Sequence, residues 1–291
     1  MENTQTLPNL LIEQRMADAW ADVLKYPADE TVLHPNAHRL AFADPEFLLR
    51  RETRGMRIQL EMLKPDLGQS MQGIDHTVVV FGSARFCSPE AAQAMLDDAE
   101  QVGTPQAIAN AQRQVRNARH YDQARLFARL VAAHSAQQPP DKRLFICTGG
   151  GPGIMEAANR GAQELGAPTV GLNIALPHEQ NANPYVTPSL SFKFHYFALR
   201  KMHFMMRAKA LVAFPGGFGT LDELFEVITL VQTKKSQPVP IVLFGSDYWK
   251  RLINIDAMVE EGVISPEDID LLHYVDDPQD AWDVIAKFYL L

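Results

Sequence analysis

The chain has 291 residues, of which 46% are hydrophobic and 21% charged, as in ordinary folded proteins. Its 27 basic and 35 acidic residues give a net charge of −8. That balance argues against a general nucleic-acid coat protein and against a polybasic membrane binder, because both need an excess of positive charge. We therefore expect neither nucleic acid nor a membrane as a partner.

The cysteine content and the first residues predict a cytoplasmic protein. Two cysteines, Cys87 and Cys147, are too few for a disulfide framework or a four-cysteine zinc site. No cationic and apolar leader opens the sequence, and its apolar runs are far shorter than the ~20 residues of a membrane helix.

Residues 1–72 are predicted to form a helical extension packed on a catalytic domain of residues 73–291. A first helix, capped by Asn9, is indicated by apolar residues four positions apart, namely Ile12, Met16, Trp20 and Leu24. A second helix is expected over residues 47–63.

Four arginines crowd this second helix: Arg50, Arg51, Arg54 and Arg57. The simpler interpretation is a solvated helix face. The alternative, an anion site bordered by some of these arginines across a subunit interface, stays open.

From residue 76 onward, short apolar runs alternate with helical stretches. The runs are unbroken, as in strands buried on both faces, and cover residues 77–81, 144–148, 169–174, 211–214 and 240–244. The helical stretches are residues 121–136, 154–165, 195–208, 221–232, 247–260 and 281–291. This order predicts an α/β fold with a Rossmann-like, doubly wound parallel sheet.

Residues 88–117 are rich in alanine, glutamine and asparagine. They are predicted to form a helical insertion after the first strand. We expect this insertion to end before the helix over residues 121–136.

Three of the predicted strands end in turns of small residues. The turns are Gly82-Ser83-Ala84-Arg85, Thr148-Gly149-Gly150-Gly151-Pro152-Gly153 and Pro215-Gly216-Gly217-Phe218-Gly219-Thr220. Ligands of open α/β sheets bind at such strand ends, where helix N-termini present unpaired N–H groups to phosphate. One glycine turn is explained equally well by tight packing, but three in one sheet indicate a small ligand that carries phosphate.

Two common phosphate-binding motifs are absent. The second turn has Ile154, and the third has Asp222, where a dinucleotide motif requires its last glycine. No Walker-type sequence occurs either. A dinucleotide-dependent oxidoreductase and a nucleoside triphosphatase are therefore disfavoured.

A basic segment precedes the third turn. Residues 180–221 contain no acidic residue, but they include Arg200, Lys201 and Arg207. The helix expected here is apolar on nearly all sides, so we expect it to be mostly buried and Arg200 to need a partner. Phosphate and carboxylate are both suitable partners.

Carboxylates return directly after the third turn, at Asp222, Glu223 and Glu226. Glu223 has two interpretations: a capping interaction with Thr220, or an acid–base group that stabilises developing positive charge. An arginine with a carboxylate suits cleavage of a glycosidic bond through an oxocarbenium-like state.

These residues resemble the Lonely-Guy family of phosphoribohydrolases, once widely labelled lysine decarboxylases. The resemblance is carried by Gly149-Gly150-Gly151-Pro152-Gly153-Ile154-Met155-Glu156, by Arg200-Lys201, and by Pro215-Gly216-Gly217-Phe218-Gly219-Thr220-Leu221-Asp222-Glu223. It covers about residues 76–245. The extension and the insertion set this chain apart from the short members, and the segment from Gly171 to Tyr185 resembles the larger bacterial branch.

The resemblance implies hydrolysis of a nucleoside 5′-monophosphate to free base and ribose 5-phosphate, with AMP the expected substrate and cytokinin riboside monophosphate an alternative. It implies Arg200 and Glu223 as the catalytic pair, a homodimer or higher homo-oligomer, and no cofactor or metal. Residues 216–220 would bind the phosphate. The full set assigned to substrate binding is Gly82, Ser83, Gly149, Gly150, Gly151, Gly153, Met155, Lys201, Gly216, Gly217, Gly219 and Thr220.

A pyridoxal-phosphate lysine decarboxylase is disfavoured, because Lys201 is the only lysine near the site and no partner for the ring nitrogen is evident. A non-catalytic nucleotide or cofactor carrier or sensor of the same fold would keep the turns and have no need of Glu223. His195 and His203 are expected to be packing or pocket-lining residues rather than metal ligands.

Overall fold

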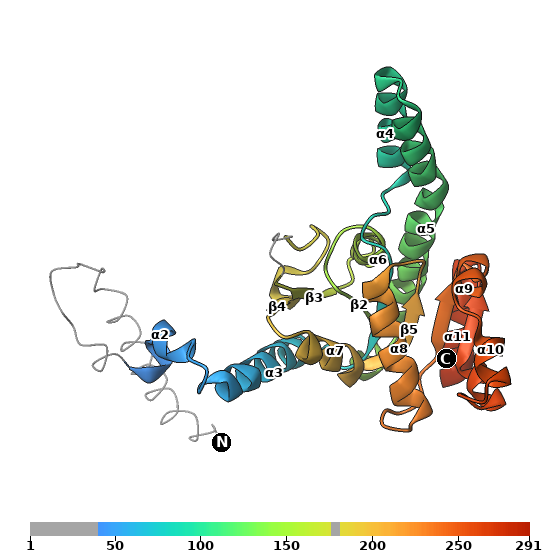
Figure 1. Cartoon of the computed structure of the whole chain (residues 1–291). Helices are drawn as coiled ribbons and strands as arrows, with labels where there is room; N and C mark the ends of the chain where they lie inside the picture. Colours follow the sequence, from blue (N-terminus) through green and yellow to red (C-terminus); the bar gives the residue numbers. More distant parts are fainter. Residues whose placement is uncertain (1–39, 176–180) are drawn as a thin grey trace. The chain divides into compact units, whose positions relative to one another are not determined.

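The computed structural model describes residues 40–175 and 181–291 of the chain (Figure 1). Its contacts divide the chain into two units, Met1–Leu60 and Glu61–Leu291. The predicted first helix, with Asn9 and its apolar stripe, lies outside the described residues, and the division at residue 72 stays a prediction. No helix in the described ranges is long and apolar enough to cross a membrane.

The described part of the first unit is short and helical. Asp44 caps α2 (Pro45–Leu48), where its carboxylate accepts a hydrogen bond from the Phe47 N–H at 3.1 Å. The second expected helix begins later than predicted, because α3 covers Arg54–Met71. Arg50, Arg51 and Arg54 are exposed, as the solvated interpretation expects, whereas Arg57 is half-buried and donates to the Arg50 carbonyl at 2.7 Å.

The second unit is built on seven parallel strands in the order β4-β3-β2-β1-β5-β6-β7. This topology confirms the Rossmann-like fold. Strands β1, β2 and β6 are buried along their whole length, and β3 and β5 along most of it, which explains their unbroken apolar runs. The strand bounds are β1 (Thr77–Phe81), β2 (Phe145–Thr148), β3 (Val170–Ile174), β4 (Ser191–Phe194), β5 (Ala208–Ala213), β6 (Ile241–Phe244) and β7 (Leu272–Val275).

The two edge strands, β4 and β7, were absent from the sequence prediction. In β4, exposed and buried residues alternate, and three of the four residues of β7 are only half-buried. Neither strand therefore shows the unbroken apolar run that marks a strand buried on both faces.

The last part of the expected insertion and the helix predicted after it form one continuous helix. Instead of ending at residue 117, the segment forms α4 (Pro89–Val102) and then α5 (Pro105–Ala136), which runs 32 residues. Gly103, at a φ of 71°, ends α4, and Thr104 caps α5. The two helices project together beyond the sheet (Figure 1).

The remaining helices follow the prediction with shifted ends, and the stretch over residues 247–260 divides into two. They are α6 (Ile154–Gln163), α7 (Phe197–Met206), α8 (Phe218–Gln232), α9 (Ser246–Leu252), α10 (Ile255–Glu260) and α11 (Pro278–Tyr289).

Each face of the sheet has its own hydrophobic core, as a doubly wound sheet requires. On one face α5, α6 and α11 bury side chains such as Phe127, Ile154 and Ile285. On the other face α7, α8 and α9 contribute Phe204, Leu224 and other apolar residues. The carboxyl ends of the strands thus open on a crevice flanked by helices from both layers.

We predict that Gly161→Ala destabilises the protein by about 1–3 kcal/mol, measured by urea unfolding. A Cβ at Gly161 would lie 2.0 Å from the backbone oxygen of Arg125, so α6 and α5 would have to separate. The control is Gly219→Ala in α8, where a Cβ meets nothing within 4 Å. Equal stability of the two variants would contradict close helix packing at Gly161.

Candidate functional site

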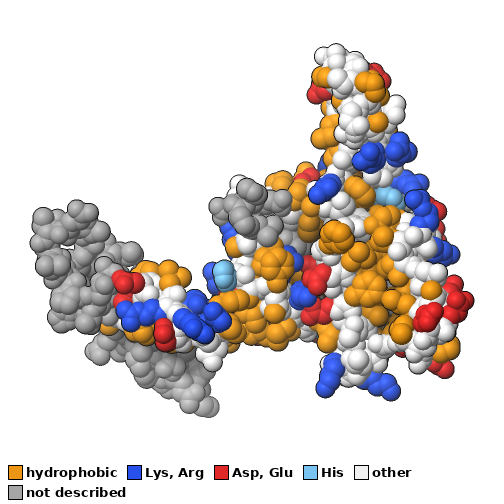
Figure 2. Space-filling model, viewed as in Figure 1, with side chains coloured by type: hydrophobic (Ala, Val, Ile, Leu, Met, Phe, Trp, Pro, Cys, Tyr) orange, Lys and Arg blue, Asp and Glu red, His pale blue; other side chains and the backbone are white. Residues whose placement is uncertain are grey.

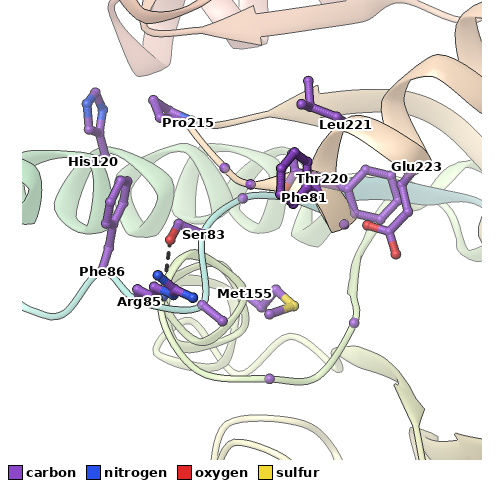
Figure 3. A pocket seen from close by; sticks show the side chains of 18 of the residues that line it. Phe81, Ser83, Arg85, Phe86, His120, Met155, Pro215, Thr220, Leu221 and Glu223 are labelled. Atoms are coloured by element: carbon purple, nitrogen blue, oxygen red, sulfur yellow. Dashed lines mark hydrogen bonds between the residues drawn. The ribbon is translucent and has the colours of Figure 1, made fainter. Parts of the chain in front are cut away.

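The three glycine-containing turns converge at one place because β2, β1 and β5 are neighbours in the sheet. The backbone of Ser83 joins them. Its N–H donates to the Pro215 carbonyl at 3.0 Å, and its carbonyl accepts from the Ile154 N–H at 3.1 Å. The first turn therefore holds the second and third in register (Figure 3).

Two glycines permit this close approach. Gly153 has a φ of 74°, and a Cβ there would lie 2.3 Å from the Ser83 carbonyl oxygen. A Cβ at Gly82 would lie 2.6 Å from the Ile154 side chain. Side chains at these positions would push the first and second turns apart.

The second turn is held by Asn183, which the sequence analysis did not single out as a site residue. Its backbone N–H donates to the Gly150 carbonyl at 2.8 Å, and its side-chain amide donates to the Gly151 carbonyl and to Asn159 at 2.9 Å each. The Thr148 hydroxyl accepts from the Gly150 N–H. Asn183 lies 32 residues after Gly151, so no local pattern indicates the contact.

The third turn leads into α8 and leaves donors available. Gly217 is the N-cap, and among the described residues no group accepts from the N–H groups of Phe218, Gly219 and Thr220. At α6, by contrast, the first N–H already donates to Ser83. The N-terminus of α8 is thus the better anion site of the two.

A cleft of about 940 Å³ opens over the three turns. It brings together most of the residues predicted for the site, namely Gly82, Ser83, Gly149, Gly151, Met155, Arg200, Gly216, Gly217, Gly219, Thr220 and Glu223. Gly150, Gly153 and Lys201 are not among the lining residues. The first two shape the second turn, and for all three a role in binding stays a prediction.

Arg200 and Glu223 form a buried ion pair at the wall of the cleft. The Arg200 Nη2 lies 2.6 Å from the Glu223 Oε1, and the two side chains are 11% and 12% exposed. The guanidinium also lies 5.3 Å from the ring centroid of Phe197 and 5.6 Å from that of Phe204. Of the two partners suggested for Arg200, the structure shows the carboxylate.

The expectation that the helix of Arg200 is mostly buried was wrong. Phe197, Met202 and Met206 on α7 are each about half exposed. Periodicity marks these residues as apolar but does not show whether a neighbour covers them.

The capping interpretation of Glu223 was also wrong. Helix α8 begins at Phe218, so Thr220 lies inside its first turn and makes no cap. The Glu223 carboxylate accepts from Arg200 instead. Burial raises the pKa of Glu223 to about 7, although the Arg200 charge acts in the opposite direction.

Lys201 lies among the neighbouring carboxylates. Its ammonium is 3.2 Å from the Asp222 Oδ1 and also pairs with Glu226. Lys201 therefore neutralises two negative charges that lie near Glu223 on α8. Both Asp222 and Glu226 act to raise the pKa of Glu223, and Lys201 acts to lower it.

The two histidines of this region lie away from the cleft lining. His203 is 2% exposed and packs against Phe194, while the backbone N–H of exposed His195 donates to Glu61 at 3.0 Å. In the described ranges, no group of three or more histidine, cysteine or acidic side chains could hold a metal ion.

We predict that the stability difference between the wild type and Glu223→Gln depends on pH. The folded-state pKa of Glu223, about 7, lies above its ordinary value of 4.5, so folding favours the protonated carboxyl. The wild type should therefore lose up to about 3 kcal/mol relative to the variant as the pH rises from 5 to 8. Urea unfolding across this range measures the difference, and a constant value would contradict the raised pKa.

Comparison with known proteins supports the resemblance seen in the sequence. Residues 155–285 match the model of the family described as "Possible lysine decarboxylase". A "Probable cytokinin riboside 5′-monophosphate phosphoribohydrolase" of Oryza sativa subsp. japonica is 32% identical over 141 residues, which are 47% of this chain and 56% of that protein. A cytokinin riboside 5′-monophosphate phosphoribohydrolase of Arabidopsis thaliana is 32% identical over 42% of this chain and 57% of its own length.

The chain thus spans a little over half the length of the curated relatives it matches. Among solved structures, the molybdenum cofactor carrier protein of Chlamydomonas reinhardtii is 18% identical, with a TM-score of 0.43 over 75% of this chain and 99% of that one. Over the region of the site, this chain is therefore similar in sequence to the family described as possible lysine decarboxylases and to curated cytokinin riboside 5′-monophosphate phosphoribohydrolases.

Proposed function

We propose that the protein hydrolyses the N-glycosidic bond of a nucleoside 5′-monophosphate, giving the free base and ribose 5-phosphate. The observation that carries this proposal is the buried Arg200–Glu223 pair, which lines the same cleft as the unpaired N–H groups of α8. Curated relatives with this activity support it.

The 5′-phosphate binds at the N-terminus of α8. The N–H groups of Phe218, Gly219 and Thr220 and the positive end of the helix dipole favour a phosphate there. The Tyr248 hydroxyl donates to the Gly216 carbonyl and steadies the turn. Phosphate binding, remote from the reacting bond, then positions C1′ near Glu223.

At C1′ the bond to the base breaks, and its electron pair leaves with the base. The ionised Glu223 carboxylate stabilises the positive charge that develops on the ribosyl ring and accepts a proton from the attacking water, whose oxygen bonds to C1′. The departing base takes up a proton from solvent, and Glu223 returns the proton it accepted to solvent, so the carboxylate is regenerated. Arg200 holds Glu223 in place, and its buried Nε–H has no partner among the described residues.

We propose AMP as the main substrate, with other purine monophosphates and cytokinin riboside monophosphate as alternatives, and a reaction in the cytoplasm without a cofactor. Apolar residues beside the ion pair, Met155, Ile174 and Phe197, offer a surface for a base. A homodimer or higher oligomer is supported by the exposed apolar side chains on α7 and by Phe218 on α8, which is 91% exposed. Hydrophobic side chains gather over this part of the surface (Figure 2).

We predict that Glu223→Gln lowers the rate of AMP hydrolysis by about 10²–10⁴-fold. The substitution keeps the size of the side chain but removes the charge that stabilises the transition state. Chromatography of adenine and ribose 5-phosphate measures the rate. The matched control is Asp222→Asn, the same change one residue earlier on α8 and outside the cleft lining, which should stay within about threefold of the wild type.

Two outcomes would contradict the proposal. Undiminished hydrolysis by Glu223→Gln would remove the carboxylate from the reaction. If AMP and a panel of other monophosphates bind but release no base, the carrier or sensor hypothesis replaces the enzyme.

We further predict that kcat/KM for AMP falls about tenfold for each pH unit below about 7. The pKa of Glu223 in the unliganded protein is raised to about 7 by burial, and protonation removes the charged form that the reaction uses. Initial rates between pH 5.5 and 9 at constant ionic strength measure the profile. A fall on the alkaline side of pH 7 would instead assign activity to the protonated carboxyl.

A further inference from the structure

The cleft continues past the third turn to a second, basic end. Figure 3 shows Glu223 at one side of the cleft and Arg85, Phe86 and His120 at the other, with the third turn from Pro215 to Thr220 between these two sides. The proposed catalytic pair and base surface occupy the first side only. At about 940 Å³, the cleft is near the upper end of the usual range for small-molecule pockets, about 300–1,000 Å³.

Two arginines at this basic end have guanidinium groups with no partner among the described residues. Arg85 follows the first turn, and Arg119 comes from α5, the helix that extends the insertion into the sheet layer. In the described part of the chain, neither guanidinium takes part in a hydrogen bond or ion pair. Unpaired guanidinium groups that line a cleft are suited to phosphate, which they bind through paired N–H donors.

The acidic groups at this end already have partners. Asp247 pairs with Arg251 at 3.2 Å, and the Asp276 carboxylate accepts from the Ser246 N–H at 2.8 Å. The Asp276 carboxylate keeps its charge, because a neutral N–H donor does not cancel it, so this end carries the two cations Arg85 and Arg119 against one acidic group.

His120 forms part of the wall at this end of the cleft and carries no charge at pH 7. It is 6% exposed, and its ring stacks on Phe86 with centroids 5.9 Å apart. Burial, reinforced by the neighbouring Arg119, lowers the pKa of His120 to about 4, so the ring is neutral at pH 7. The neutral Phe86–His120 stack borders the two arginines and gives this end a rigid side.

We propose that the basic end is a second anion subsite, formed by Arg85 and Arg119, which takes a phosphate group linked to the 5′-phosphate of the bound nucleotide. This inference rests on the proposed function for the position of the first phosphate, at α8. Since the third turn separates the basic end from Glu223, the additional group extends from the phosphate and not from the base. The ligand class is therefore a nucleoside diphosphate or a nucleotide joined through a pyrophosphate.

The test compares ADP with AMP by isothermal titration calorimetry on the full chain, at one ionic strength. We expect ADP to bind about tenfold more tightly than AMP and to compete with it. Arg85→Gln and Arg119→Gln should each lower the ratio of ADP affinity to AMP affinity about fivefold or more. The matched control is Arg116→Gln, an exposed arginine on the same helix that does not line the cleft and should leave this ratio unchanged.

Binding of ADP no tighter than AMP would overturn the subsite, and so would a ratio that neither substitution at Arg85 or Arg119 changes. The proposed hydrolysis is judged separately, by release of adenine from AMP. A protein that binds ADP through the two arginines but releases no adenine would keep the subsite and refute the hydrolase. A protein that releases adenine from AMP but binds ADP no more tightly than AMP would support the hydrolase and refute the subsite.

Discussion

The site depends on one pair of backbone hydrogen bonds. Through its N–H and its carbonyl, Ser83 ties the turn after β1 to the turns after β5 and β2, which are its neighbours in the sheet. Because glycine stands at Gly82 and Gly153, the three backbones approach closely enough for these bonds to form. The N-terminus of α8, which we propose binds phosphate, the wall formed by Met155 and the approach to Arg85 all lie directly beside this contact.

Burying the ion pair of Arg200 and Glu223 costs free energy of hydration, which the rest of the fold must offset. Removing two charges from water is unfavourable, and a close contact between them recovers only part of that free energy. The rings of Phe197 and Phe204 beside the guanidinium help to stabilise it. The residual cost appears in the pKa of Glu223, which is raised to about 7. A carboxylate destabilised in this way is well suited to meet a positive charge that develops on a substrate.

Helix α5, which continues the insertion, lines the second end of the cleft. Helix α5 is much longer than a crossover helix requires, and its residues Asn117, Arg119 and His120 reach the carboxyl edge of the sheet as part of the cleft wall. Helices from both faces of the sheet thus contribute to one cleft: α7 and α8 carry the ion pair, and α5 carries Arg119 and His120 of the basic end.

The sequence by itself determined the class of the fold, the central strands and the three glycine turns, because these depend on local rules: strands buried on both faces need unbroken apolar runs, and close backbone turns need glycine. It also indicated Arg200 and Glu223 as candidates. Only the tertiary structure decided that these two pair with each other, that Lys201 pairs with Asp222 and Glu226, and that Asn183 holds the second turn. The tertiary structure also decided the edge strands and the full length of α5. Each of these features depends on contacts between residues far apart in the chain, which periodicity and spacing do not record.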